Sequence, residues 1–297
     1  MSVRINPDLL PNLLASIQQN EQNESTATTE LSSGRTINSP SDNPAAAAAV
    51  VFNHDQSSQD AQFLQNISTL QGRFQTADST ISNVVEVLNQ ALSLGTEGAT
   101  GTLSATDRQA IATEVQGLLT QAVGLANTTY QGAYLFGGTN VTQQPFVVDP
   151  TTGAVTYQGN SKTTSVEISQ GNSISANVPG DQLFLNASGS VLGALQDLYT
   201  ALNTSANMPA AVTEVESALT QLDTQRVTYG NALNQINLSE SFLNQDKLNL
   251  SEQENTLEGA DLSVVATNFA QAQLADQATL SATSQVLSQK TLLDYLV

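Results

Sequence analysis

Few residues in this sequence have side chains suited to catalysis or metal binding. The 297-residue chain contains one histidine, His54, and no cysteine, which excludes thiolate metal sites and a cysteine nucleophile. The acidic residues of its central part, Asp149, Glu167 and Asp181, lack the spacing of a calcium loop or a catalytic carboxylate pair. The chain also has no glycine-rich phosphate loop. We therefore predict a protein that is not an enzyme and needs no cofactor, with His54 as an ordinary surface or core residue.

The charge balance restricts the partners. Eight basic and 27 acidic residues give a formal net charge of −19 at pH 7, so we expect no nucleic-acid binding, which requires Lys and Arg. The longest apolar run, Ala45 to Phe52, is too short to span a bilayer, so we expect no membrane insertion. The N-terminal residues show no basic leader followed by an apolar segment, so we also expect no cleaved signal peptide.

A heptad repeat from Val212 to Leu257 indicates which elements position the remaining residues. Steps of seven reach only apolar residues: Val215, Leu222, Tyr229, Ile236, Leu243, Leu250 and Leu257. This period is typical of a coiled-coil helix, which would be roughly 70 Å long at about 1.5 Å per residue. Arg226 lies among apolar neighbours, and we expect it to set the register by pairing with an acidic residue. The pattern favours a rod over a compact bundle.

A second seam and several caps delimit the other helices. The counterpart seam steps by three and four residues: Ile67, Leu70, Phe74, Ala77, Ile81, Val84, Leu88 and Ala91. Gly34 is expected to end the first helix, and Asn43 before Pro44 to begin the second. Asp261 is expected to cap the last helix, which follows Gly259.

Between about Thr139 and Leu185 the period changes to two. Residues 146–148 and 155–157 flank a turn that contains proline and glycine, as in a hairpin. Residues 166–168 and 173–178 alternate in the same way. A core this small gives only marginal stability by itself, so we expect these strands to pack against the helices.

The predicted fold is therefore mainly α: an elongated antiparallel coiled-coil rod built from both chain ends, with a small β-rich insert. We predict three domains. Residues 1–44 with 259–297 form a terminal coiled-coil assembly domain, residues 45–138 with 186–258 form a helical rod, and residues 139–185 form an outer β-rich insert.

Three segments of the chain resemble the bacterial flagellin family. Residues 31–38, Leu-Ser-Ser-Gly-Arg-Thr-Ile-Asn, resemble its N-terminal signature, with Thr36 at the family's arginine position and Arg35 one residue earlier. Residues 127–138 resemble the exit of a helix into a β region, and the ending Leu-Leu-Asp-Tyr-Leu at 292–296 resembles the C-terminal signature. Together these segments indicate a structural subunit of the flagellum.

Within this family, the Asp-Asn-Pro-Ala continuation at residues 42–45 and the C-terminal ending are closest to subunits of the hook–filament junction. The resemblance implies an extracellular adaptor between the first hook–filament junction protein and the flagellin filament. It further implies copies of itself in a ring, a flagellar export chaperone, and type III export without a cleaved signal. Two alternatives remain open: a minor or short flagellin, and a secreted coiled-coil binding module.

The residues expected to mediate assembly lie in the two terminal segments. We expect these segments, about 1–36 and 261–297, to be largely disordered in the free subunit and to fold together on assembly. The spacing places Phe269, Leu280 and Leu287 on one helix face. The predicted assembly residues are Leu10, Leu14, Ile17, Leu31, Arg35, Ile37, Asn38, Phe269, Leu280, Leu287, Leu292, Leu293 and Leu296.

Overall fold

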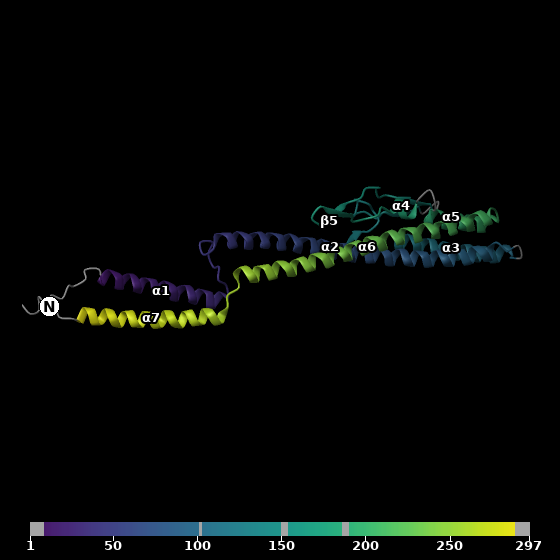
Figure 1. Cartoon of the computed structure of the whole chain (residues 1–297). Helices are drawn as coiled ribbons and strands as arrows, with labels where there is room; N and C mark the ends of the chain where they lie inside the picture. The colour runs from purple at the N-terminus through teal and green to yellow at the C-terminus, as the bar shows by residue number, and fades with distance from the viewer. Residues whose placement is uncertain (1–8, 101–102, 150–153, 186–189, 289–297) are drawn as a thin grey trace, which may run out of the picture. The chain divides into compact units, whose positions relative to one another are not determined.

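A computed structural model describes residues 9–100, 103–149, 154–185 and 190–288, and it confirms the predicted mainly α fold with a small β-rich insert (Figure 1). The helices of the described residues are α1 (Leu9–Ser33), α2 (Pro44–Gly98), α3 (Ala105–Ala126), α4 (Gly180–Phe184), α5 (Val191–Thr204), α6 (Met208–Glu258) and α7 (Leu262–Ser288). The strands are β1 (Thr129–Tyr130), β2 (Ala133–Tyr134), β3 (Phe146–Val148), β4 (Val155–Tyr157), β5 (Ser165–Ser169) and β6 (Asn172–Ser175).

The chain divides into two compact units. The terminal unit comprises Met1–Ser58 and Asp246–Val297, and the central unit comprises Gln59–Gln245. Helices α2 and α6 have residues in both units. The two units divide within these helices, whereas the predicted boundaries near residues 44 and 259 lie at the start of α2 and just after the end of α6. The three-domain division stays a prediction.

Helices α2 and α6 pair antiparallel in the central unit through the two predicted seams. The Nε2 of Gln71 donates a hydrogen bond to Asn237, at 3.0 Å. The ring of Phe74 lies edge-on to that of Tyr229, with centroids 5.5 Å apart. Every predicted α2 seam residue from Ile67 to Ala91 is buried, as periodic apolar spacing requires of a packed helix.

Two polar side chains in this pair differ in their environment. Burial raises the pKa of the Tyr229 hydroxyl well above its ordinary value, so the ring stays neutral. The Nε of Arg226 lies 3.3 Å from Oδ1 of Asp78, and both side chains are half-exposed. The predicted pairing of Arg226 with an acidic residue is thus confirmed, and its partner Asp78 lies on the opposite helix, α2.

The predicted caps Gly34, Asn43 and Asp261 are found at three helix ends, and a fourth cap starts α3. Gly34 takes a positive φ of 70° after α1, where its N–H bonds the carbonyl of Glu30. The side chain of Asn43 accepts a hydrogen bond from the Ala46 N–H at the start of α2. Ser104 and Asp107 form the reciprocal capping box of α3, and Asp261 accepts bonds from the first turn of α7.

The described strands form two-stranded antiparallel sheets: β1–β2 just before the β-rich insert, and β3–β4 and β5–β6 within it. The predicted pairing of residues 146–148 with 155–157 is confirmed. Strand β6 ends at Ser175, earlier than the predicted 178, although the Ala176 N–H still bonds the carbonyl of Thr164. The sequence did not predict β1–β2 or α4, which are too short to show a period.

Aromatic packing orders the insert, and hydrogen bonds and a shared core hold it on the helices of the central unit. The ring of Phe184 in α4 lies edge-on to those of Phe136 and Phe146, with centroids 5.2 and 5.4 Å away. Asn66 of α2 donates to the carbonyl of Glu167 in β5, at 3.0 Å. The strands therefore share one core with the helices, in line with the expectation that so small a β region needs support.

Candidate assembly surface

Helices α1 and α7 bring the two ends of the chain together in the terminal unit. Asn20 donates a hydrogen bond to Thr279 at 3.2 Å, and Gln273 donates to Glu24 at 3.2 Å. As the residue number rises in α1 it falls in α7, so the two helices run antiparallel. The polar run Gln18–Glu30 gives α1 too few apolar residues to be stable alone, and α7 supplies the partner it needs.

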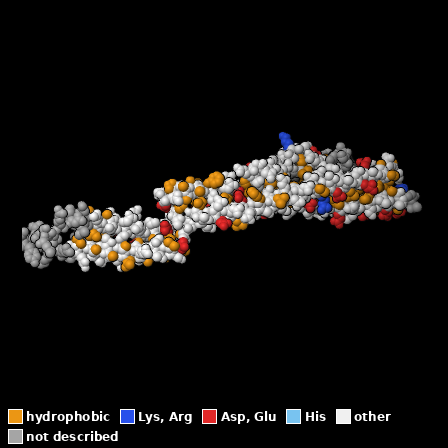
Figure 2. All heavy atoms as spheres, in the orientation of Figure 1, with side chains coloured by type: hydrophobic (Ala, Val, Ile, Leu, Met, Phe, Trp, Pro, Cys, Tyr) orange, Lys and Arg blue, Asp and Glu red, His pale blue; other side chains and the backbone are white. Residues whose placement is uncertain are grey.

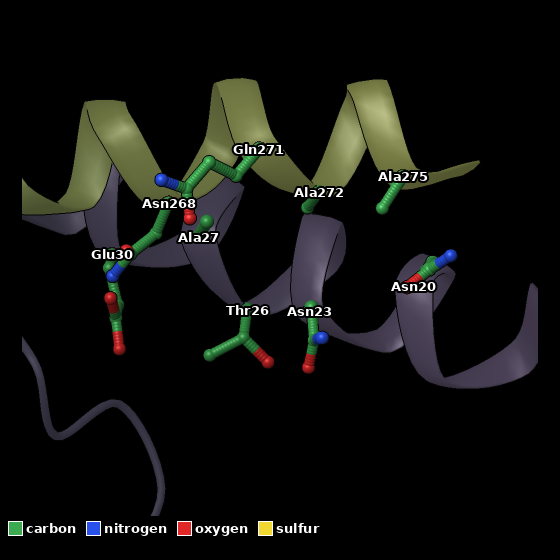
Figure 3. Close-up of a pocket in the computed structure, with 9 residues that line it drawn as sticks. All are labelled: Asn20, Asn23, Thr26, Ala27, Glu30, Asn268, Gln271, Ala272 and Ala275. Carbon is green, nitrogen blue, oxygen red and sulfur yellow. The ribbon is translucent and has the colours of Figure 1, made fainter. Parts of the chain in front are cut away.

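The contact between the two helices is built from small and polar side chains. Ala27 of α1 is buried, as are Val265 and Ala272 of α7. Figure 3 shows Ala272 and Ala275 pointing from α7 toward α1. Together with neighbouring residues they line a groove of about 430 Å³ whose other walls are Asn20, Asn23, Thr26, Glu30, Asn268 and Gln271. Small side chains let the helices approach closely, but they bury little apolar area, so the pair gains little stability from its own contact.

Several large apolar side chains of this helix pair are exposed to solvent. In α1, Leu14 is 59% exposed. In α7, exposed fractions are 53% for Leu262, 54% for Val264, 69% for Leu274 and 50% for Leu280. At 100° per residue, Leu262 and Leu280 share one side of α7, whereas Leu274 and Val264 lie about 120° and 200° around the helix from Leu262. We call these five residues the terminal apolar surface.

Several bonds join the connector after α1 to the end of α6 and the short segment before α7. The Nε of Arg35 lies 3.3 Å from Oε1 of Glu258, and the N–H of Thr36 donates to the carbonyl of Glu258 at 2.7 Å. A further bond has its donor on the other segment: the Ala260 N–H donates to the carbonyl of Gly34 at 3.0 Å. The amide of Asn38 donates to the Arg35 carbonyl at 2.8 Å, which orders the turn. Arg35 and Asn38 therefore fix this connector within one chain.

The predicted assembly residues fall into distinct environments. Leu14 and Leu280 belong to the terminal apolar surface, whereas Ile17, Leu31, Ile37 and Phe269 are half-buried. Leu10 lies in α1 and Leu287 in α7, but their side chains are outside the described part. The remaining three, Leu292, Leu293 and Leu296, lie outside the described residues altogether.

Sequence reasoning missed several residues of this region. Leu274 was not among the predicted assembly residues, although it is the most exposed large apolar side chain that the structure describes on α7. Glu258 was also missed, and its position just before Gly259 was the available signal. Asp42 accepts bonds from the N–H groups of Asn38 and Ser39, at 3.0 and 2.8 Å, as an aspartate in a Ser-Pro-Ser-Asp turn often does.

The described residues also bear on metal binding and membrane insertion. Within those ranges no three His, Cys, Asp or Glu side chains gather closely enough to hold a metal ion. The Nδ1 of His54 lies 3.6 Å from Oε1 of Glu254, and the histidine side chain is 57% exposed. In the same part of the chain, none of the helices combines the length and hydropathy that a membrane span requires.

Comparisons with known proteins agree with this structural reading. Residues 10–141 match the model of the bacterial flagellin N-terminal helical region, and residues 212–296 match that of the C-terminal helical region. The flagellar hook-associated protein 3 of Escherichia coli is 25% identical over 237 residues, covering 78% of this chain and 74% of that protein.

Solved structures of low sequence identity share the fold. A flagellar hook-associated protein of Vibrio parahaemolyticus has a TM-score of 0.66 at 21% identity, over 73% of this chain and all of that one. The flagellar junction protein of Legionella pneumophila has a TM-score of 0.61 at 16% identity, over 71% of this chain and all of that one.

Proposed function

Because this chain belongs to the bacterial flagellin family, we propose that it is a structural subunit of the flagellar hook–filament junction. Members of this family are structural proteins rather than enzymes, and the chain is one of them. The relatives named for the hook and the junction favour the junction over the filament itself. The proposed place is outside the cell, as an adaptor between the first hook–filament junction protein and flagellin.

The observation that carries an assembly role is the terminal apolar surface. It lies on two helices from opposite chain ends, and the charged side chains that the structure describes on them are all acidic: Glu21, Glu24, Glu30 and Asp276. A free subunit leaves Leu274 and Leu280 in water, whereas neighbouring subunits would cover them. Burial of each such side chain stabilises by about 1.5–3 kcal/mol when complete.

We further propose that α1 and α7 are only weakly held in the free subunit and become stable when neighbours pack on them. Their mutual contact through Ala27 and Ala272 supports this proposal, because small side chains contribute little burial energy. An export chaperone is the expected partner before assembly, since it would cover the same apolar side chains. Export through the flagellar type III channel, without a cleaved signal peptide, completes the proposal.

Electron microscopy of flagella carrying a labelled subunit tests the proposed function. The chain should appear as a thin ring at the distal end of the hook. Label along the whole filament would instead identify a minor flagellin, and label absent from the flagellum would contradict both. Loss of the subunit should release filaments from otherwise complete hooks.

A further inference from the structure

Two short segments of the terminal unit are bonded to each other between its helices. One, residues 34–36, directly follows α1, and the other, residues 258–260, includes the end of α6 and leads to α7. We call these six residues the connector clip. They are joined by an ion pair, by two backbone hydrogen bonds and by a bond from the Thr36 hydroxyl to the Glu258 carbonyl at 3.2 Å. All of these bonds lie outside α1 and α7, so the clip can stay closed when those two helices separate.

Each side of the connector clip supplies a group that the other side lacks. Glu258 ends α6, where the last carbonyl groups have no partner within the helix, and Thr36 donates to its carbonyl. The Glu258 side chain is only 10% exposed, and Arg35 supplies its counter-charge. The chain has eight basic residues against 27 acidic ones, and Lys and Arg are few on the face shown in Figure 2. A carboxylate that loses Arg35 therefore finds few replacements.

Backbone geometry also fixes the connector clip. A Cβ atom at Gly259 would lie 2.4 Å from the carbonyl oxygen of Asn255, so a larger residue there requires the backbone to shift. Gly259 forms an antiparallel bridge with Arg35, next to Gly34 with its φ of 70°. The clip thus depends on glycine at both crossings as well as on side-chain pairing.

The contact between α1 and α7, by contrast, discriminates weakly between different alignments of the two helices. Its buried residues include Ala27 and Ala272, which fit against many neighbours. The bond from Asn20 to Thr279 is one of the few that favour the alignment of the structure. Sliding one helix by a heptad would bring Ala272 opposite Asn20 instead, which loses this hydrogen bond but puts no large side chain into the contact.

The connector clip excludes such a slide. A slide of one heptad moves one helix along the other by about 10 Å, at about 1.5 Å per residue. Gly34 directly follows α1, and Asp261 alone separates Ala260 from the first residue of α7. Since a fully extended residue spans at most about 3.6 Å, these joints cannot absorb the slide while Ala260 stays bonded to Gly34.

We propose that the connector clip sets the alignment of α1 with α7, so that the two helices pair only with Asn20 opposite Thr279. The alignment also decides how Leu14 of α1 lies relative to the α7 members of the terminal apolar surface, because a slide would displace them by about 10 Å. The inference goes beyond the proposed function, since it concerns the free chain whatever that chain assembles with.

Disulfide trapping in the purified full-length subunit tests the proposal, because the chain has no cysteine of its own. Asn20→Cys with Thr279→Cys reports the alignment of the structure, and Asn20→Cys with Ala272→Cys reports a slide of one heptad. Each double variant is equilibrated in a glutathione redox buffer, and the intramolecular disulfide is measured by gel mobility. With the clip intact, the first pair should form its disulfide and the second should not.

Opening the connector clip should allow the second disulfide. Arg35→Ala leaves the Glu258 carboxylate buried without its counter-charge, and Gly259→Ala introduces the clash with Asn255. Either variant should raise the yield of the shifted disulfide by about tenfold, as expected for a charge left buried without its partner or a comparable strain. Ser41→Ala is the matched control, since the described bond of its side chain is to Ser39 in the same connector, and it should leave the yield unchanged.

Circular dichroism of each variant gives the helical content at which the yields are compared, and Arg35→Lys, which restores the charge, should return the shifted disulfide toward its low level. The inference is overturned if the shifted disulfide forms as readily as the first one with the clip intact, a comparison that needs no clip variant. It is also overturned if both clip variants leave that disulfide absent, or if Ser41→Ala raises it as much as they do. The proposed function is unaffected by these outcomes, because microscopy of the labelled subunit tests it separately.

Discussion

The contact between Tyr229 and Phe74 stabilises the pairing of α6 with α2 in the central unit. Tyr229 is the aromatic member of an otherwise aliphatic α6 repeat, and it meets Phe74 edge-on from the opposite helix. Such aromatic pairs are worth about 0.5–1.5 kcal/mol beyond their buried area. The nearby ion pair of Arg226 and Asp78 is half-exposed, and pairs of that kind contribute about 0–1 kcal/mol. Ring packing therefore outweighs charge in setting the stability of this layer.

Phe74→Ala should destabilise the central unit by about 3–5 kcal/mol, because it removes a buried ring and leaves a cavity against Tyr229. Denaturant unfolding followed by circular dichroism measures the change in the free energy of unfolding. Gln75→Ala, on the exposed side of the same turn, is the control and should change it by less than about 0.5 kcal/mol. Equal effects of both variants would mean that the α2 seam does not face a packed core.

Glu214 gives a prediction about pH. Desolvation raises the pKa of its carboxyl group, and the charge of Asp197 and a hydrogen bond to it raise the pKa further. Because the folded-state pKa is above the unfolded one, the folded state is favoured at low pH and loses stability as pH rises through the folded pKa. Glu214→Gln should therefore raise the melting temperature at pH 7 relative to the parent chain, and this difference should vanish below about pH 4. A constant difference at both pH values would show that the two carboxyl groups are not coupled.

At the scale of elements, the contrast between two helix pairs is the main result. Helices α2 and α6 meet through leucine, isoleucine and aromatic side chains, whereas α1 and α7 meet through alanine and polar groups. Elements with few buried apolar contacts open locally at low free energy. The terminal pair is therefore the part of the described structure from which we expect local opening.

Hydrogen exchange of the purified subunit should show this difference. Amides of α1 and α7 should exchange orders of magnitude faster than those of α2 between Ile67 and Ala91. A variant at a buried alanine should enlarge the difference. Ala272→Leu should overpack the contact between α1 and α7 and accelerate amide exchange in α7 further, while exchange in the α2 seam, the internal control, stays unchanged. Slow, cooperative protection across α7 in the parent chain would contradict the proposal that these helices become stable on assembly.

Periodicity predicted the long helices and their seams, because a repeat sustained over many turns leaves few alternatives, and residue types predicted the caps Gly34, Asn43 and Asp261. It also predicted that Arg226 pairs with an acid, but not that Asp78 is the partner, since spacing within one helix does not reveal the register of the other. The spacing of Val265, Phe269 and Ala272 by four and three residues does indicate one side of α7, but it does not show that Leu274 and Leu280 stay exposed. Val265 and Ala272 are buried while Leu274 and Leu280 are exposed, because small side chains, not large ones, allow the close approach of these two helices.

At the scale of the whole molecule, we expect the terminal apolar surface to affect incorporation of the subunit into the flagellum without affecting the stability of the free subunit. Leu274→Ser combined with Leu280→Ser removes exposed apolar area, so the melting temperature of the free subunit should not fall. The same variant should fail to join the flagellum stably, because neighbours lose the side chains that they would cover. Motility and the amount of subunit in isolated flagella measure this, with Gln277→Ser on α7 as the control. Normal incorporation would mean that this surface stays in water after assembly.

The pairing of α1 with α7 also has a consequence for the order of folding. Asn20 and Thr279, which bond to each other, are 259 residues apart in the chain. The contact requires closing a very long loop, so it forms late compared with local contacts within the central unit. A polypeptide interrupted anywhere before α7 folds its earlier part yet leaves α1 without its partner. A chain that lacks α7 also lacks four of the five residues of the terminal apolar surface, so we expect prematurely terminated products not to assemble.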